Sequence, residues 1–384
     1  MTAQPDNFGF GTEEQMLKTE ARKFFKNNCD DLKLMDLVAQ DPDPHRQPAC
    51  HWDRKAWKQM GELGWTSLAV PERAGGIGMQ AVGVAGLVEE AGRAAFPSPL
   101  LTSVNAIYVL SCCRSPEADD ILRSIAGGKS ASLGIMDPNG SWKGTTAGFK
   151  ASVSGTTLLD GTSWFVQDAQ KVDFFVVKAA FEEGAGLIAV PREAQGLEVV
   201  ADSIVDLTRD QAHIVFRGVE IEPEWIVAMP GKADAVIEMA EPFIFTMIAA
   251  DMCGAGEWQL KTCAEYAKSR VQFGRPIGFF QAVKHPIVNM MIMIDEARSL
   301  MYNAACGADH EPEQFAGYAH MAKSSAGDMA QYCSDRCIQL HGGMGFTWEA
   351  TAHLYFKRQL HNKALFGDGR YHRAQLADMM MGRM

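Results

Sequence analysis

Apolar residues recur at three- and four-residue spacing through the first third of the chain. The spacing is clear in EEQMLKTEARKFFKNN (residues 13–28), and AVGVAGLVEEAGRAA (residues 81–95) is rich in helix-forming residues. Between them lies GELGWTSLAVPERAGGIGMQ (residues 61–80), where Pro71 and the glycines around it mark turns. The pattern predicts helices joined by a turn-rich connection up to about residue 127.

Short runs with strand character replace the helical spacing in the middle of the chain. Val, Ile, Phe and Trp gather in these runs, and Gly, Asp and Pro separate them. We predict a β domain, either a barrel or a sandwich, that ends near residue 230. The runs are ASLGIMD (131–137), SWFVQDA (163–169), DFFVVKAA (173–180), GLIAV (186–190) and HIVFRGVEI (213–221).

Four long segments with apolar positions at helical spacing fill the last part of the chain. They are 232–269, 279–307, 312–340 and 349–382. Their connections are short, which places neighbouring helices antiparallel and predicts a four-helix bundle. Helices, then strands, then helices indicate an α+β protein with domains at 1–127, 128–230 and 231–384.

The net charge and the cysteine content indicate which binding partners and which cellular compartment to expect for this protein. A net charge of -11 over 384 residues argues against a nucleic-acid partner, because phosphate binding needs a basic face. The chain has nine cysteines without a secreted spacing pattern, and its first residues lack a basic and apolar leader. Both features predict a cytoplasmic protein with reduced thiols.

We expect no membrane span, since no apolar run is long enough. Gly-x-Gly-x-x-Gly does not follow any predicted strand, so we expect no Rossmann domain.

The densest group of candidate binding residues is SRVQFGRPIGFFQAVKH (269–285). Arg270 and Arg275 flank a Phe-Gly turn, and a new helix is predicted after Pro276. Arginine charge and free backbone amides at such a corner suit a diphosphate. A tight loop with solvated arginines is the alternative, and the residue types alone do not decide between the two.

A second group, IQLHGGMGFTWE (338–349), places two adjacent glycines at the end of a predicted helix. Glycines let a ligand or another backbone approach closely, and Gln339 offers an amide, although a glycine-terminated helix explains a lone Gly-Gly pair better. Cys333, Cys337 and His341 share one face of this helix. They suit zinc, but a fourth ligand and Cys-x-x-Cys turns are missing, so we expect core cysteines and no metal.

Together these segments resemble the acyl-CoA dehydrogenase family over essentially the whole chain. GELGWTSLAVPERAGGIGM resembles the family's N-terminal signature, RVQFGRPIGFFQAVKH its flavin-contacting corner, and QLHGGMGF its C-terminal glycine motif. The resemblance implies FAD shared across a subunit interface, and therefore an oligomer. By similarity, one chain holds the diphosphate and adenosine with Arg270, Phe273 and Gln281, and Gln339 and Gly343 reach the cofactor from the neighbouring chain's side.

The resemblance also identifies candidate neighbours of the flavin ring. LGIMDP (133–138) occupies the place of the family's flavin-binding strand, and Phe165 stands where many relatives have a tryptophan against the ring. Met136, Asp137 and Phe165 are therefore the expected ring contacts.

The family reaction implies a carboxylate that removes the α-proton while hydride leaves the β-carbon for the flavin. Here Phe366 stands at the place of the common glutamate, and Ile244 at that of the less common one. Glu241, about one helical turn before Ile244, and Asp368 are two possible replacements. The third possibility is a base-lacking subunit of a heteromer, in which a homologous chain supplies the glutamate.

Several further expectations follow from the same resemblance. The partners implied are an acyl-CoA substrate and electron-transfer flavoprotein, with a homo-oligomer or a heteromer as the assembly. FTWEATAHLYFKR (346–358) resembles bacterial dehydrogenases of steroid side-chain CoA thioesters, several of which contain two unlike chains. Two other classes stay open: a scaffold subunit that only completes a partner's cofactor site, and a flavin-dependent oxygenase on the same fold.

Overall fold

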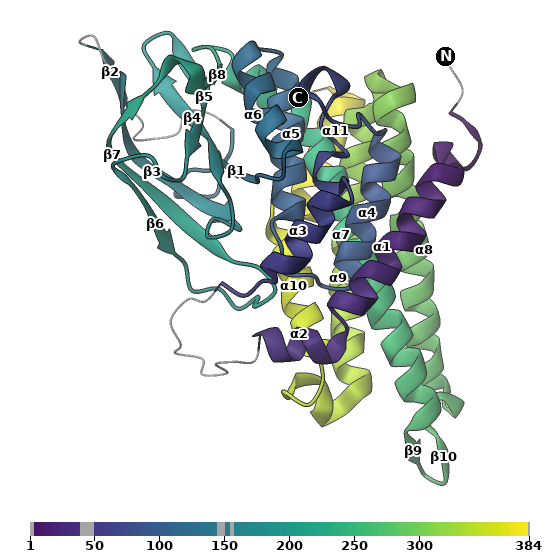
Figure 1. Cartoon of the computed structure of the whole chain (residues 1–384). Helices are drawn as coiled ribbons and strands as arrows, with labels where there is room; N and C mark the ends of the chain where they lie inside the picture. Colours follow the sequence, from purple (N-terminus) through teal and green to yellow (C-terminus); the bar gives the residue numbers. More distant parts are fainter. Residues whose placement is uncertain (1–3, 39–49, 144–149, 154–156, 383–384) are drawn as a thin grey trace.

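The computed structural model describes residues 4–38, 50–143, 150–153 and 157–382, and it confirms the α+β prediction. Helices come first, an eight-stranded sheet follows, and long helices end the chain (Figure 1). The sheet lies on one side of the molecule and the bundle on the other, with α5 between them. No helix in the described ranges combines the length and the hydropathy that crossing a bilayer requires.

Six helices form the N-terminal part. In α4 every residue from Ala81 to Gly92 is buried, and the helix crosses α7 very closely. A Cβ at Gly92 would lie 2.2 Å from the Asp251 carbonyl oxygen, so the helices could not come this close with a larger residue there. The six are α1 Thr12–Asn28, α2 Asp31–Val38, α3 Arg54–Glu62, α4 Ala81–Arg93, α5 Leu100–Cys113 and α6 Pro116–Ala126.

The middle strands form one sheet in the order β6-β7-β3-β2-β4-β5-β8, and β1 pairs with β4 in parallel. Register shifts interrupt the β3–β7 ladder between Ser163 and Val166, and such bulges re-aim side chains. The strands are β1 Ala131–Gly134, β2 Lys150–Val153, β3 Thr157–Gln167, β4 Phe174–Phe181, β5 Gly184–Pro191, β6 Leu197–Ala201, β7 Gln211–Ile221 and β8 Ile226–Ala228.

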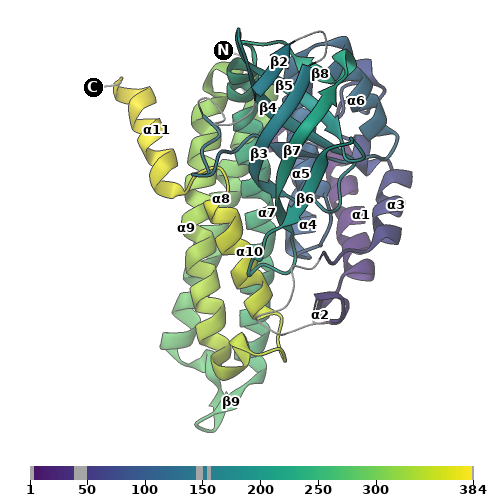
Figure 2. The same ribbon diagram turned by 90° about the vertical axis from the view of Figure 1, so that its left-hand side faces the viewer.

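The C-terminal part contains α7 Ala233–Ser269, α8 Gln281–His310, α9 Pro312–His341, α10 Ala352–Ala364 and α11 Gly369–Met381. A hairpin of β9 Val271–Gln272 and β10 Arg275–Pro276 joins α7 to α8. The segment predicted as one helix over 349–382 is two helices. Phe366 and Gly367 have φ of 52° and 92°, which no helix accommodates, and Asp368 then caps α11. Helix α11 consequently projects from the bundle (Figure 2).

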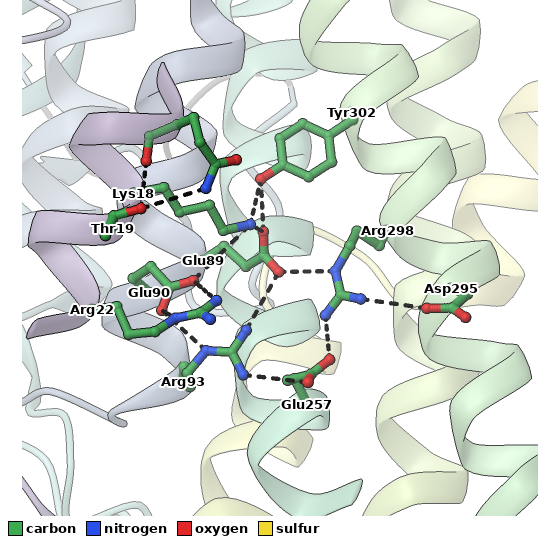
Figure 3. A network of polar contacts seen from close by, with 11 residues as sticks. Lys18, Thr19, Arg22, Glu89, Glu90, Arg93, Glu257, Asp295, Arg298 and Tyr302 are labelled. Atoms are coloured by element: carbon green, nitrogen blue, oxygen red, sulfur yellow. Dashed lines mark hydrogen bonds and ion pairs between the residues drawn. The ribbon is translucent and has the colours of Figure 1, made fainter. Parts of the chain in front are cut away.

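A buried polar network joins α1, α4, α7 and α8 (Figure 3). Its centre is Glu89, whose side chain is fully buried and accepts hydrogen bonds from Lys18, from Arg298 at 2.9 Å and from Tyr302 at 2.7 Å. The neighbouring Glu90 binds the guanidinium groups of Arg22 and Arg93. Burial alone would raise the pKa of Glu89, but the surrounding cations and the hydrogen bonds from Lys18 and Tyr302 lower it to about 2.

Candidate active site

A small cavity lies where the sheet meets α5, α7 and the end of α10. Its volume is about 20 Å³, which is room for about one water molecule. Two predicted ring contacts, Met136 and Phe165, line it together with Phe366. The full lining is Leu101, Thr102, Asn105, Ser132, Leu133, Met136, Phe165, Gln167, Arg209, Ile248, Leu365 and Phe366.

Two aromatic residues of this cavity have backbones in the left-handed region. The φ angle is 54° at Phe165 and 52° at Phe366. Such a conformation costs roughly 1 to 3 kcal/mol for a residue other than glycine and persists only where the surroundings impose it. Phe165 lies within the β3–β7 irregularity, and its neighbour Trp164 bridges to Met136. The strand and the helix break thus bring these side chains together from positions 200 residues apart.

Polar atoms in the same wall lack partners. Asn105 Oδ1, Gln167 Oε1 and Arg209 Nε are buried and form no hydrogen bond within the described part of the chain. Burying such an atom unsatisfied costs about 1 to 3 kcal/mol, so these atoms indicate a wall suited to a polar group. Sequence reasoning missed them. Thr102 and Asn105, two polar residues three apart in a largely apolar helix, were the available signal.

No carboxylate is among the described residues that line this cavity. Glu241 is buried in a different cavity, which Lys143 and His320 also line. Its Oε1 accepts a 2.8 Å hydrogen bond from Trp142 Nε1, and the Trp142 ring packs against Phe366 with centroids 5.3 Å apart. The indole of Trp142 therefore lies in contact with both groups. Burial raises the pKa of Glu241, while Lys143, 3.6 Å away, and Trp142 oppose the rise.

The other two carboxylates named from the sequence are engaged in backbone turns. Asp368 is exposed and accepts a 2.9 Å hydrogen bond from the Tyr371 N–H at the start of α11. That bond lowers the pKa of Asp368, which favours the charged cap. Asp137 accepts from the backbone N–H groups of Asn139 and Ser141, at 2.8 and 2.9 Å. Neither side chain lines the small cavity.

The β9–β10 hairpin lies at the far end of the bundle (Figure 1). A surface groove of about 620 Å³ is lined by residues of this hairpin and of the helix ends beside it. Arg270, Gln339 and Gly343 all line it, so a single chain brings these three residues together. Arg270 is exposed and forms no salt bridge with any residue that the structure describes. A Cβ added at Gly343 would meet nothing within 4 Å, and its φ is not positive. Folding of the chain therefore does not require glycine at this position.

The two remaining predicted residues lie beside the groove rather than in its lining. Phe273 sits in the hairpin turn with a φ of 54° and is 87% exposed. Gln281 is the exposed first residue of α8. Both are exposed at the hairpin end of the bundle, where a neighbouring molecule could reach them.

Comparisons with known proteins agree with this architecture. The acyl-CoA dehydrogenase N-terminal domain matches residues 11–115, and the acyl-CoA dehydrogenase C-terminal domain matches residues 246–381. Acyl-CoA dehydrogenase IpdE2 of Mycobacterium tuberculosis is 32% identical over 347 residues, which cover 90% of each chain. The chain belongs to the acyl-CoA dehydrogenase family.

Solved structures of low identity share the fold over nearly the whole length. One is a variant of the Tcur3481–Tcur3483 steroid ACAD, with a TM-score of 0.84, 24% identity and coverage of 97% of this chain and 98% of that one. Another is the ChsE4–ChsE5 complex of Mycobacterium tuberculosis, with a TM-score of 0.85, 21% identity and coverage of 98% and 100%.

As a member of the acyl-CoA dehydrogenase family, the chain is an FAD-dependent oxidoreductase for acyl-CoA thioesters. The groove and the small cavity differ in how well they fit FAD. The groove offers an unpaired guanidinium, an exposed amide and a glycine with open space above it, a donor set that suits a diphosphate. The small cavity has polar atoms for a ring edge, but Phe165 and Phe366 leave no room in it for a three-ring flavin.

Proposed function

We propose that this chain is the base-lacking subunit of a heteromeric acyl-CoA dehydrogenase. Its groove holds the diphosphate and adenosine of an FAD whose ring lies in the cavity of a homologous partner chain. The partner supplies the carboxylate that removes the α-proton. FAD accepts the hydride, and this chain contributes binding and orientation rather than proton transfer.

The observation that carries this proposal is the filled, carboxylate-free cavity. A dehydrogenase that removes an α-proton needs a base within hydrogen-bond reach of that proton. By the resemblance of the motifs Phe366 stands at the position of the family's glutamate, and the cavity that it lines has a volume of about 20 Å³. A space of that size is smaller than the ring or the thioester, which favours chemistry in another chain.

The groove supports a role in completing a neighbour's cofactor site. Gly343 has no packing reason to be glycine, which favours a ligand that passes close to its backbone. A guanidinium bonded to a diphosphate makes charge-assisted hydrogen bonds, the stronger class. Arg270 is free to make them.

An exposed apolar strip favours assembly with another chain. On α8, Val288, Met291 and Ile292 are 46%, 45% and 54% exposed at spacings of three and four residues, and Phe273 and Phe279 near the hairpin are 87% and 58% exposed. Contiguous exposed apolar surface marks interaction sites. Two of the similar structures carry the names of two chains, Tcur3481–Tcur3483 and ChsE4–ChsE5, which supports unlike subunits by analogy.

We extend the proposal to the substrate, the acceptor and the compartment. A steroid-derived acyl-CoA is the favoured substrate class, because a similar structure is described as a steroid ACAD. Electron-transfer flavoprotein is the proposed acceptor. All nine cysteines are free thiols, which supports a reducing compartment such as the cytoplasm.

A second candidate function is an enzyme with its own base, Glu241. Burial raises the pKa of this carboxylate, and a raised pKa suits a general base. Rotation of Trp142 would have to open a path from Glu241 to the small cavity. The ion pair with Lys143 and the Trp142 hydrogen bond both hold Glu241 where it is.

Co-expression with a homologous dehydrogenase chain from the same genome separates the two candidates. We expect one FAD for every two chains, because only the partner's cavity accepts the ring. Glu241→Gln should leave anaerobic bleaching by acyl-CoA unchanged, as should the matched change Glu238→Gln on the same helix. One FAD per chain, or bleaching lost in Glu241→Gln alone, would establish the second candidate instead.

A further inference from the structure

Three potential metal ligands meet in the interior directly beneath the groove. Cys263 of α7 and Cys337 and His341 of α9 each offer one ligand atom, and these atoms lie within 4.8 Å of one another. All three residues are buried. The sequence pattern had paired Cys337 and His341 with Cys333, but the structure brings Cys263 to the group from another helix.

Hydrogen bonding fixes the tautomer of the histidine, whose Nδ1 also lies 3.9 Å from Cys337 Sγ. His341 Nδ1 lies 2.8 Å from the carbonyl oxygen of Cys337, and a carbonyl only accepts, so Nδ1 carries the proton. The lone pair of the neutral ring is then on Nε2. A backbone carbonyl that fixes one ring nitrogen in this way orients the ring for a metal at the other. Stacking on Tyr266, with centroids 4.6 Å apart, holds the ring further.

Spacing and charge both point to a divalent ion with soft ligands. In tetrahedral zinc sites sulfur and nitrogen ligands are about 3.6 to 3.8 Å apart, so small side-chain rotations suffice here. Two thiolates and a neutral imidazole cancel the charge of Zn²⁺, which avoids the cost of an unpaired buried charge. Binding releases one proton from each thiol. The adjacent cleft, which Thr262, Tyr266 and His341 line, can supply water as a fourth ligand.

We propose that Cys263, Cys337 and His341 form a zinc site that ties α7 to the end of α9. His341 directly precedes Gly342 and lines the groove, and Tyr266 lines it too. A metal at this place would fix the backbone from which Gly343 faces the cofactor. The site does not depend on the proposed role in a heteromer.

The test uses the tag-free full chain, reduced with a phosphine and freed of metal by a chelator. Zn²⁺ is titrated against a chromophoric chelator, and Co²⁺ reports thiolate ligation through its charge-transfer absorption. We expect one equivalent in the wild type and an affinity at least about 100-fold lower in Cys263→Ser and Cys337→Ser. Cys333→Ser, a buried cysteine one turn away on the same helix face, is the matched control and should bind as the wild type does.

Three results would overturn the proposal. They are no stoichiometric Zn²⁺ binding by the wild type, equal loss in Cys333→Ser, or a Cys263–Cys337 disulfide in place of metal binding. If a serine variant fails the far-UV circular dichroism check for folding, His341→Gln replaces it, with the same expected loss of affinity.

Discussion

Replacing Glu89 should lower the free energy of unfolding, and two separate arguments give the size of the loss. A pKa of about 2 in place of 4.5 for a fully buried carboxylate corresponds to about 3 kcal/mol of stability. Removing one member of a buried ionic network, which leaves its partners unpaired, costs roughly 3 to 5 kcal/mol. Glu89→Gln should therefore destabilise the chain by about 3 to 5 kcal/mol, because Lys18 and Arg298 lose the buried carboxylate that they share (Figure 3).

The expected shift in melting temperature follows from the size of the chain. An unfolding entropy of about 2.1 cal/mol/K per residue gives about 0.8 kcal/mol/K for 384 residues, so Glu89→Gln should melt about 4 to 6 °C lower. Glu20→Gln is the matched control on α1. Its exposed pair with Lys23 is worth at most about 1 kcal/mol, so the melting temperature should move by about 1 °C or less.

The same network sets a pH dependence with a definite sign. The folded pKa of Glu89 is below the unfolded one, so its contribution is present above pH 4.5 and is lost as the pH falls toward about 2. Melting scans between pH 7 and pH 3 should show a shallower acid decline in Glu89→Gln than in the wild type. Parallel curves, or a shift no larger than that of Glu20→Gln, would refute the reasoning.

Three further changes test the groove and the helix break. Arg270→Ala should weaken FAD retention by the heteromer roughly 10- to 150-fold, because it removes a charge-assisted contact of about 1.5 to 3 kcal/mol. Arg275→Ala is the control and should leave FAD retention unchanged, since the Arg275 guanidinium stacks on Phe279. Equal losses in the two variants by flavin titration would contradict this assignment. Gly343→Ala should lower FAD retention and leave the melting temperature unchanged, because a Cβ there meets no other atom within 4 Å. Gly342→Ala should lower both FAD retention and the melting temperature, because the φ of Gly342 is 60°. Asp368→Ala should lower the free energy of unfolding by about 1 kcal/mol in urea titrations through loss of the α11 cap, and no change would remove that role.

The apolar pattern predicted the elements well where the segments are long. The bundle segments 232–269 and 312–340 differ from α7 and α9 by one residue at their ends. The break at Phe366 was missed because neither phenylalanine nor a single glycine demands a positive φ. Tertiary contacts impose that conformation, and no local pattern records it.

The sequence predicted only part of the candidate site, because several of its residues are distant from one another in the sequence. Motifs pointed to Arg270 on one chain and to Gln339 and Gly343 on its neighbour, whereas the structure brings the three together in one groove of a single chain. Asn105, Gln167 and Arg209 come from a helix, a strand and a loop that are far apart in sequence, so spacing could not join them. Cys263 was missed for the same reason, since it completes its cluster from a second helix.

The measurement that tests the central claim most directly is made on the chain expressed alone. Its flavin absorbance is recorded, and a panel of acyl-CoA thioesters is added anaerobically with and without added FAD. The account predicts no bleaching by any thioester, because the cavity accepts neither ring nor substrate and contains no base. Bleaching of a flavin bound to this chain alone would contradict it and would show that the chain carries its own catalytic carboxylate.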